Sequence, residues 1–224
     1  MLDQKYRDFH RAISRTIAKE NIITDPLRKV AIGADASFYR LVPQIIVDVE
    51  NEREVRVVLR EARTRKLPVT FRAAGTSLSG QSITDSILVR LGRGWDHCHI
   101  SEDAERIRLQ PGIIGGFANR ALAPFDRKIG PDPASIDTAK IGGILANNAS
   151  GMCCGVEQNS YQTLDSVRLI LADGTVVDTA DDLSVRDFRK SHGALLERLA
   201  NMRKQILRDE RLRQRIEHKF KIKN

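Results

Sequence analysis

Residues 71–82 read Phe-Arg-Ala-Ala-Gly-Thr-Ser-Leu-Ser-Gly-Gln-Ser, a run of small residues with two glycines. It continues a short β-like run at 68–72 and precedes a second apolar run at 86–91. A strand that ends in small residues exposes a row of backbone N–H groups, which suits phosphate oxygens. Small side chains also let a ligand approach the backbone closely. The same composition is typical of an ordinary turn between strands, and composition alone leaves both interpretations open.

The sequence before this loop predicts a βαβ unit. Residues 44–49 form a continuous apolar run, which is typical of a buried strand in a parallel sheet. Asn51 can cap a following helix, and Glu54 can reach back to its start. Residues 69–72 form the next strand, so the small-residue loop falls at the carboxyl end of a strand, where such units bind ligands. The buried face of the helix is expected to be Val55, Val58, Leu59 and Ala62.

A second segment, residues 130–155, is again poor in bulky side chains and rich in Gly, Ala, Ser and Asn. Two such segments in one chain suggest two walls of one elongated ligand site. The chain has no G-x-G-x-x-G opening a helix and no Walker A Gly-Lys-Ser/Thr after its glycine-rich loop. These absences argue against nicotinamide-only and ATP-dependent chemistry.

Three motifs, in order, carry a resemblance to a known family. They are Arg72-x-x-Gly75-Thr76-Ser77-Leu78-Ser79-Gly80, Gly130-Pro131-x-Pro133-x-Ser135 and Gly142-Gly143-x-x-x-Asn147-x-x-x-Gly151. Together they resemble the FAD-binding domain of the vanillyl-alcohol-oxidase (PCMH-type) flavoproteins, above all the long, iron–sulfur-containing D-lactate and D-2-hydroxyacid dehydrogenases. The resemblance covers residues 23–179. It implies an α+β, PCMH-type FAD-binding fold, with a small parallel βαβ subdomain and a mainly antiparallel β subdomain with flanking helices.

The resemblance also implies a division of the chain. Residues 1–22 are expected to form an N-terminal helix, and residues 23–93 the first FAD-binding subdomain with its pyrophosphate loop at 72–81. Residues 94–183 are expected to form the second subdomain. Residues 184–224 are expected to be a basic helical segment that starts the truncated remainder of a longer enzyme.

Periodicity predicts the other elements. An apolar stripe at helical spacing marks the N-terminal helix: Leu2, Tyr6, Phe9, Ile13 and Ile17. Strands are expected at 95–100, 106–110, 165–172 and 175–179, and the last two are joined by a turn at Asp173-Gly174. Helices are expected at 115–125, 139–146, 182–190 and 193–220. The helix at 115–125 is expected to bury Phe117, Ala121, Leu122 and Phe125, and 30–39 to be a loop or short strand.

The resemblance implies contacts to FAD. The backbone of 73–78 is expected to bind the diphosphate, since such hydrogen bonds are charge-assisted, and 131–135 and 142–151 to line the isoalloxazine and ribityl side. Arg72 either adds charge or braces the loop, and Asn147 either bonds the cofactor or closes a turn. The expected set is Arg72, Ala73, Ala74, Gly75, Thr76, Ser77, Leu78, Gly80, Gln81, Pro131, Asp132, Ser135, Gly142, Gly143, Asn147, Ser150 and Gly151.

Two departures from the family shape the expectation. Many members attach flavin through a histidine where this chain has Thr76, and threonine cannot do so, which predicts non-covalent FAD. The family's substrate-binding cap, with its catalytic histidine, and the last FAD-domain segment do not appear before Asn224. No C-x-x-C-x-x-C run is present, so an iron–sulfur cluster is expected only in a part of the enzyme beyond this chain. No catalytic residue and no metal ligand is assigned, and the chain is expected to be an N-terminal fragment.

The implied activity is oxidation of a D-2-hydroxy acid by hydride transfer to flavin N5. D-lactate is the first expectation; D-2-hydroxyglutarate or glycolate is the alternative, because the substrate pocket lies outside this chain. The electron acceptor is undetermined, with a quinone or a cytochrome open, and so is the oligomeric state. Whether this chain alone retains FAD also stays open.

Composition limits the remaining function classes. The net charge is +8, and most of the excess falls in residues 201–224. This run is either a solvated helix face or a nucleic-acid or membrane-surface module; no aromatic side chains interleave the charges, so nucleic-acid binding is not expected.

Cellular location is also bounded by composition. The three cysteines, Cys98, Cys153 and Cys154, make no disulfide framework and indicate a reducing compartment. The charged N-terminus is no secretory signal, and no apolar stretch could cross a bilayer. The chain is expected to be cytoplasmic, with peripheral contact to the inner face of the membrane left open. A role for Cys153 and Cys154 is also left open.

Overall fold

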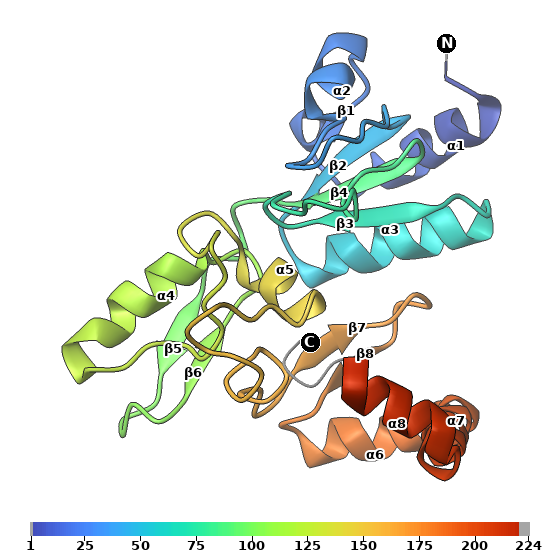
Figure 1. Ribbon diagram of the computed structural model, residues 1–224. Helices are drawn as coiled ribbons and strands as arrows, with labels where there is room; N and C mark the ends of the chain where they lie inside the picture. The colour runs from blue at the N-terminus through green and yellow to red at the C-terminus, as the bar shows by residue number, and fades with distance from the viewer. Residues whose placement is uncertain (1, 220–224) are drawn as a thin grey trace.

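The computed structural model describes residues 2–219 and arranges three β-sheets along the chain, one of four strands and two of two strands (Figure 1). The four-stranded sheet has the order β1-β2-β4-β3. Its strands are β1 (Ile22–Ile23), β2 (Ile45–Val49), β3 (Val69–Arg72) and β4 (Ile87–Leu91). β2 and β3 both run parallel to β4, so the carboxyl ends of all three strands lie at one edge.

α3 (Glu52–Thr64) connects β2 to β3 and confirms the predicted βαβ unit. Its start is capped as expected: the Asn51 side chain accepts a 3.0 Å hydrogen bond from the Glu54 N–H. The Glu54 carboxylate in turn accepts a 2.8 Å bond from the backbone N–H of Glu50. The predicted buried face is confirmed, and Val57 joins it: Val55, Val57, Val58, Leu59 and Ala62 are all buried.

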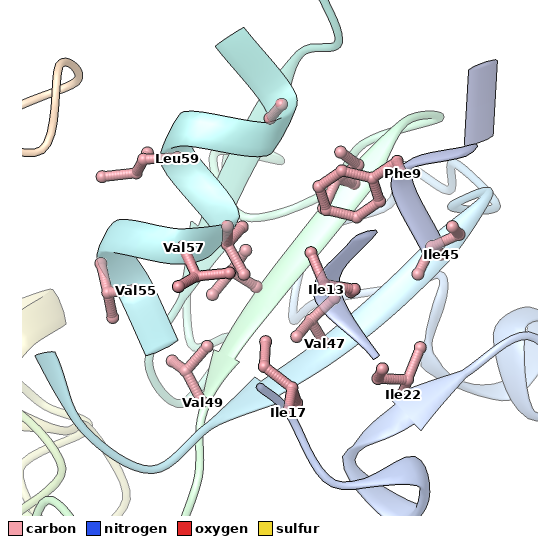
Figure 2. Packing of buried hydrophobic residues seen from close by; sticks show 14 of the residues in the cluster. Phe9, Ile13, Ile17, Ile22, Ile45, Val47, Val49, Val55, Val57 and Leu59 are labelled. Carbon is pink, nitrogen blue, oxygen red and sulfur yellow. The ribbon is translucent and has the colours of Figure 1, made fainter. Parts of the chain in front are cut away.

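α1 (Gln4–Ile13) shares one core with this sheet and with α3. Phe9 and Ile13 are completely buried, Ile17 is 2% exposed, and Figure 2 shows these side chains pointing between the helix α3 and the strands. The predicted stripe is therefore confirmed as buried or half-buried, but the helix expected over residues 1–22 was too long, because α1 ends at Ile13 and Ile17 is buried beyond it. After α1 the chain forms the 3-10 helix η1 (Lys19–Asn21) and then β1.

The prediction for residues 30–39 was wrong in its first part, because α2 (Pro26–Ile32) continues to Ile32. The side chain of Asp25 accepts a 2.8 Å bond from the Arg28 N–H, and Pro26 stands at the first helical turn. Both are ordinary helix-start signals. Residues 33–40 then form an irregular segment closed by a single β-bridge between Ala34 and Arg40.

The second sheet confirms the strand pair predicted in residues 95–110. It joins β5 (Cys98–Ile100) to β6 (Ile107–Leu109) in antiparallel fashion. The helix expected at 115–125 is α4 (Gly115–Leu122) with the 3-10 turn η2 (Ala123–Phe125), and the short helix expected at 139–146 is α5 (Ile141–Ala146).

The buried face predicted for α4 was wrong except at Leu122. Phe117 is 60% exposed, Phe125 is 49% exposed and Ala121 is exposed. The helix instead buries its glycines with Ala118, because a Cβ at Gly115 would lie only 2.5 Å from the Ile136 side chain. Close approach of residues 136–137 thus sets which side of α4 faces inward. On the exposed side, the Arg120 guanidinium lies 4.3 Å from the centroid of the Phe117 ring.

The third sheet confirms the predicted hairpin: β7 (Arg168–Ile170) pairs with β8 (Val176–Asp178). Then come α6 (Asp182–Ser191), α7 (Gly193–Arg208) and α8 (Glu210–Lys219). The single helix expected at 193–220 is thus two helices that break at Asp209, whose carboxylate accepts a 2.9 Å bond from the Leu212 N–H. Residue 220 lies outside the described residues.

The three C-terminal helices bury no residue fully. The apolar stripe of α7 is exposed: Leu195, Leu199, Met202 and Ile206. None of the helices in residues 2–219 has the length and apolar character needed to cross a membrane.

Candidate functional site

The loop after β3 is shaped by two glycines in the left-handed region. Gly75 has φ +78° and Gly80 has φ +69°, conformations that residues with a side chain rarely adopt. A Cβ on Gly75 would lie 3.3 Å from the Arg72 side chain, and one on Gly80 would lie 3.0 Å from the Tyr39 ring. The loop therefore lies tightly on its support and presents mostly backbone.

The backbone of this loop leaves a row of donors open. Within residues 2–219, the N–H groups of 74–78 donate to no protein acceptor. The next donors are satisfied locally, since the N–H groups of Ser79 and Gln81 both bond to the Ser77 hydroxyl, at 3.1 and 3.3 Å. Successive open N–H groups at the end of a strand form a concave anion-binding surface.

Arg72 joins the two ends of the loop. It is 7% exposed, and its Nε donates to the Ser82 carbonyl at 2.9 Å while Nη1 donates to the Ile32 carbonyl at 2.7 Å. Burial lowers the pKa of the guanidinium. Nη2 is buried, and among the described residues it has no hydrogen-bond partner. Two guanidinium nitrogens of Arg72 therefore brace the loop, and the third, Nη2, is an unused donor beneath the loop.

Sequence reasoning missed two residues that hold this loop, Asp35 and Ser82. The Asp35 carboxylate accepts bonds from the hydroxyl and the N–H of Ser82 at 3.0 and 3.4 Å. It also accepts a 2.9 Å bond from the Ser37 N–H. The sequence Asp-Ala-Ser signals this last turn locally, whereas nothing local links Asp35 to a serine 47 positions later.

The second small-residue segment meets the loop at α5. The Cβ position of Gly143 lies 3.4 Å from the Cβ of Ala73, and the Gln81 side-chain amide donates to Asn147 Oδ1 at 3.3 Å. Gly142 packs on the other side, where a Cβ would lie 2.8 Å from the Pro111 ring. The structure thus brings two of the three predicted motifs into direct contact.

The end of the third motif, at Gly151, lies against the second motif, at Asp132. A Cβ on Gly151 would overlap the carbonyl of Asp132, so these two predicted residues pack backbone to backbone. Pro131 is buried, the Asp132 carboxylate lies 3.8 Å from Lys128 Nζ, and the Ser135 carbonyl accepts from Thr138 and Ala139. No hydrogen bond or ion pair between described residues links 131–135 to the loop after β3.

A cleft of about 850 Å³ opens at the carboxyl ends of β2 and β4, beside Ala73. This is within the usual size of small-molecule and cofactor sites. Arg90 and Asp48 form a two-bond ion pair in its wall, with both distances 2.7 Å, and Lys140 reaches in with Nζ 3.5 Å from the Leu91 carbonyl. Neither Arg90 nor Lys140 belongs to the site residues that the sequence predicts. The lining is Asn21, Asp48, Glu50, Ala73, Arg90, Leu91, Gly92, Arg93, Trp95, Asp96, Gly112 and Lys140.

The donors present fit a dinucleotide with a diphosphate. Open N–H groups, glycines that leave the backbone bare and the unused Nη2 of Arg72 are all suited to anionic oxygens. Thr76 stands in the loop with no nucleophilic ring nitrogen. Over residues 2–219, no group of three or more His, Cys, Asp or Glu side chains could hold a metal ion.

Comparison with known proteins agrees with this chemistry. The family model described as FAD binding domain matches residues 43–180. The chain is 29% identical over 150 residues to D-2-hydroxyglutarate dehydrogenase of Pseudomonas putida and 30% identical over 157 residues to glycolate oxidase subunit GlcD of Escherichia coli K12. These alignments cover 65% and 66% of this chain but only 15% and 32% of the two relatives. A D-lactate dehydrogenase of Archaeoglobus fulgidus is 27% identical over 138 residues.

Solved structures share the fold at low identity. Alkyldihydroxyacetonephosphate synthase superposes with a TM-score of 0.65 at 16% identity, over 80% of this chain and 37% of its own. 6-Hydroxy-D-nicotine oxidase of Arthrobacter nicotinovorans gives 0.64 at 22% identity, over 75% and 37%. The predicted PCMH-type, α+β fold is confirmed by these neighbours and by the family match.

Proposed function

The chain belongs to the FAD binding domain family, and from that premise we propose that it binds FAD non-covalently as the cofactor part of a D-2-hydroxy-acid oxidoreductase. The observation that carries the proposal is the row of open N–H groups at 74–78, on a loop that the second glycine-rich segment contacts directly. The chain spans 15 to 32% of the first curated relatives it matches, so the activity is proposed for a longer protein.

The proposed roles follow the geometry. The N–H groups of 74–78 would hold the diphosphate through charge-assisted bonds. Gly142 and Gly143, which approach Pro111 and Ala73, would let the ribityl chain pass close to the backbone. Pro131, Asp132, Ser135, Asn147, Ser150 and Gly151 would line the isoalloxazine side. Residues 23–93 and 94–183 would be the two subdomains flanking the cofactor.

The proposed reaction is oxidation of D-lactate, with D-2-hydroxyglutarate or glycolate as the alternative. Bound FAD would supply the acceptor for the hydride leaving C2 of the hydroxy acid. The residues of this chain would bind and orient the cofactor, and we assign none of them as an acid or a base. All three candidate substrates occur in the names of the relatives, and an iron–sulfur cluster, a quinone or a cytochrome would belong to the longer protein.

An absorption spectrum of the purified chain tests the cofactor proposal. Flavin bands should survive desalting after FAD is added and should leave with the supernatant on acid precipitation. Flavin in the acid pellet would contradict the non-covalent link inferred from Thr76. Absence of bound flavin at saturating FAD would overturn the proposal for this chain.

A matched pair of substitutions tests the diphosphate position. Leu78 and Leu27 are 76% and 77% exposed, so Leu78→Asp and Leu27→Asp should each leave the fold intact. Only Leu78→Asp places a carboxylate beside the open N–H row, and it should weaken FAD binding by about tenfold or more, since like charges repel. Equal effects of the two variants would contradict a diphosphate at this loop.

A further inference from the structure

We propose that Asp35 is a positioning residue that fixes the loop 73–81 in its binding shape before any ligand arrives. The inference rests on the proposed FAD function, because it concerns the same loop. Asp35 itself does not belong to the row of donors, and no motif of the sequence pointed to it.

The carboxylate of Asp35 uses both oxygens. Oδ1 accepts the 2.9 Å bond from the Ser37 N–H, which closes a tight turn in its own segment. Oδ2 accepts from the Ser82 hydroxyl at 3.0 Å and from the Ser82 N–H at 3.4 Å. Ser82 is 9% exposed and directly follows the loop, so Asp35 holds the loop's last turn from outside.

The segment around Asp35 holds the loop at other points as well. The Ala36 N–H donates to the Gly75 carbonyl at 3.0 Å, and the Tyr39 ring packs against Gly80. Arg72 also joins the end of the loop to α2, because its guanidinium donates to the Ile32 and Ser82 carbonyls. The segment 33–40 therefore holds the loop near its start, at Gly75, and at its end, at Gly80 and Ser82.

Charge explains why an acid stands at this position. Burial opposes ionisation of Asp35, but the hydrogen bonds from Ser37 and Ser82 outweigh it and lower the pKa of the carboxyl. The charge of Asp35 also favours the charged form of the buried Arg72 guanidinium, against the effect of burial. Asparagine would keep the size of the side chain but lose this charge and one of the two acceptor oxygens, so its NH2 group would face the N–H of either Ser37 or Ser82.

Holding the loop in advance should increase affinity. Ordering each residue of a free loop costs about 1–2 kcal/mol, and a loop with two glycines has more freedom to lose. A loop already fixed by Asp35 transfers that cost from binding to folding.

Asp35→Asn, with Asp25→Asn as its matched control, tests the proposal on the complete 224-residue chain. Asp25 caps α2, no hydrogen bond or ion pair between described residues joins it to the loop, and asparagine caps equally well. Amide hydrogen exchange of the ligand-free protein should quicken in the peptide covering 73–86 for Asp35→Asn alone, while exchange in α3 stays unchanged. The Kd for FAD, from quenching of flavin fluorescence, should rise about tenfold, or ~1.4 kcal/mol.

A double-substitution cycle adds a readout that general destabilisation would not produce. Ser82→Ala removes the hydroxyl partner, so its effect on loop exchange should be largely absent in the Asp35→Asn background. Additive effects, unchanged loop exchange, or faster exchange across the whole sheet would each overturn the proposal. If the unsubstituted chain fails to bind FAD, the proposed function fails, and the exchange data on the ligand-free protein still decide the role of Asp35.

Discussion

Single residues of the candidate site are constrained most where a side chain is missing. Gly151 packs against the Asp132 carbonyl so closely that a Cβ would overlap backbone, which cannot move aside as a flexible side chain can. Gly193, at the start of α7, has nothing within 4 Å of its Cβ position. A side chain at position 151 should therefore disturb the structure, whereas one at position 193 should be accommodated.

Gly151→Ala should lower the free energy of unfolding by about 1–3 kcal/mol, as overpacking does, and should weaken FAD binding with it. Gly193→Ala should leave the free energy of unfolding unchanged or raise it by roughly 0.5–1 kcal/mol, because alanine restricts the unfolded chain. Urea unfolding of both variants checks the pair. A Gly151→Ala protein as stable as the parent would show that Asp132 and Gly151 are not in contact.

Asp173 gives a pH dependence. Its carboxylate accepts a 2.9 Å bond from His192 Nε2, and this bond, with the Thr175 N–H, lowers the pKa of Asp173 from 3.8 to about 2. A carboxyl with a lowered pKa stabilises the fold above its ordinary value, and the stabilisation disappears as the pH falls toward 2.

Asp173→Asn should therefore cost up to about 1 kcal/mol near pH 5, a value limited by solvent screening because Asp173 is one-third exposed. The difference from the parent should shrink steadily below pH 4 and vanish near pH 2. Urea unfolding at several pH values measures it. A stability difference that grew on acidification would contradict a stabilising role for the ionised Asp173 carboxylate.

At this scale the sequence predicted residues whose role is local. The glycines of the loop and the Asn51 cap follow from backbone and spacing rules, and the structure has them in place. The sequence did not predict the roles of Asp35 and Lys140, because their partners Ser82 and Leu91 lie 47 and 49 positions away. Pairings over such distances depend on the fold and leave no local signal.

Among the elements, α1 is the one whose contribution to stability is easiest to test. Phe9 on α1 is fully buried against the sheet and α3, whereas Leu199 on α7 is 52% exposed. Phe9→Ala should cost about 3–5 kcal/mol, and Leu199→Ala should stay within about 0.5 kcal/mol. Thermal unfolding compares them. A small effect at Phe9 would mean that α1 is not part of the core.

The hairpin β7–β8 is attached to α3 by charge. Arg168 donates two bonds, 2.6 and 2.9 Å long, to the Glu52 carboxylate and lies 3.6 Å from Asp178. These bonds raise the pKa of Arg168 and lower that of Glu52. A two-bond guanidinium–carboxylate pair is stronger than a typical surface pair.

Arg168→Met should lower the free energy of unfolding by about 1 kcal/mol at low salt, and by less in about 0.5 M NaCl, where charges are screened. Arg106→Met is the control, because Arg106 and Asp165 form a 3.4 Å pair with both side chains mostly exposed. That variant should show no measurable change. Equal losses of unfolding free energy in the two variants would mean that loss of any surface charge, and not the Arg168–Glu52 pair, causes the effect.

Elements were predicted well where periodicity was strong and poorly where packing decides. The strands β2 to β8 and α3 follow from apolar runs and turn signals. The inward face of α4 was predicted from its large side chains, but its glycines face inward instead because residues 136–137 approach them closely. When contact with another segment decides which face of a helix is buried, the sequence of the helix alone does not predict that face.

At the scale of the whole molecule, the loop after β3 and the second glycine-rich segment are in direct contact although 60 or more residues separate the contacting positions, as between Gln81 and Asn147. The shared small-residue composition of the two segments predicted that they are two walls of one site, and their contact is consistent with that prediction. The strand order β1-β2-β4-β3 was not predicted, because parallel strands of similar composition do not reveal which of them is central.

That strand order has a consequence for how the chain is made. β3 pairs with β4, and β2 reaches β3 only through β4, which follows both of them in the sequence. During synthesis, β2 and β3 leave the ribosome as strands still waiting for their shared central partner. The loop 73–81 lies between β3 and that partner, so the pairing of β3 with β4 brings the two ends of the loop together. The candidate cofactor loop is thus closed by the same step that completes the middle of the sheet.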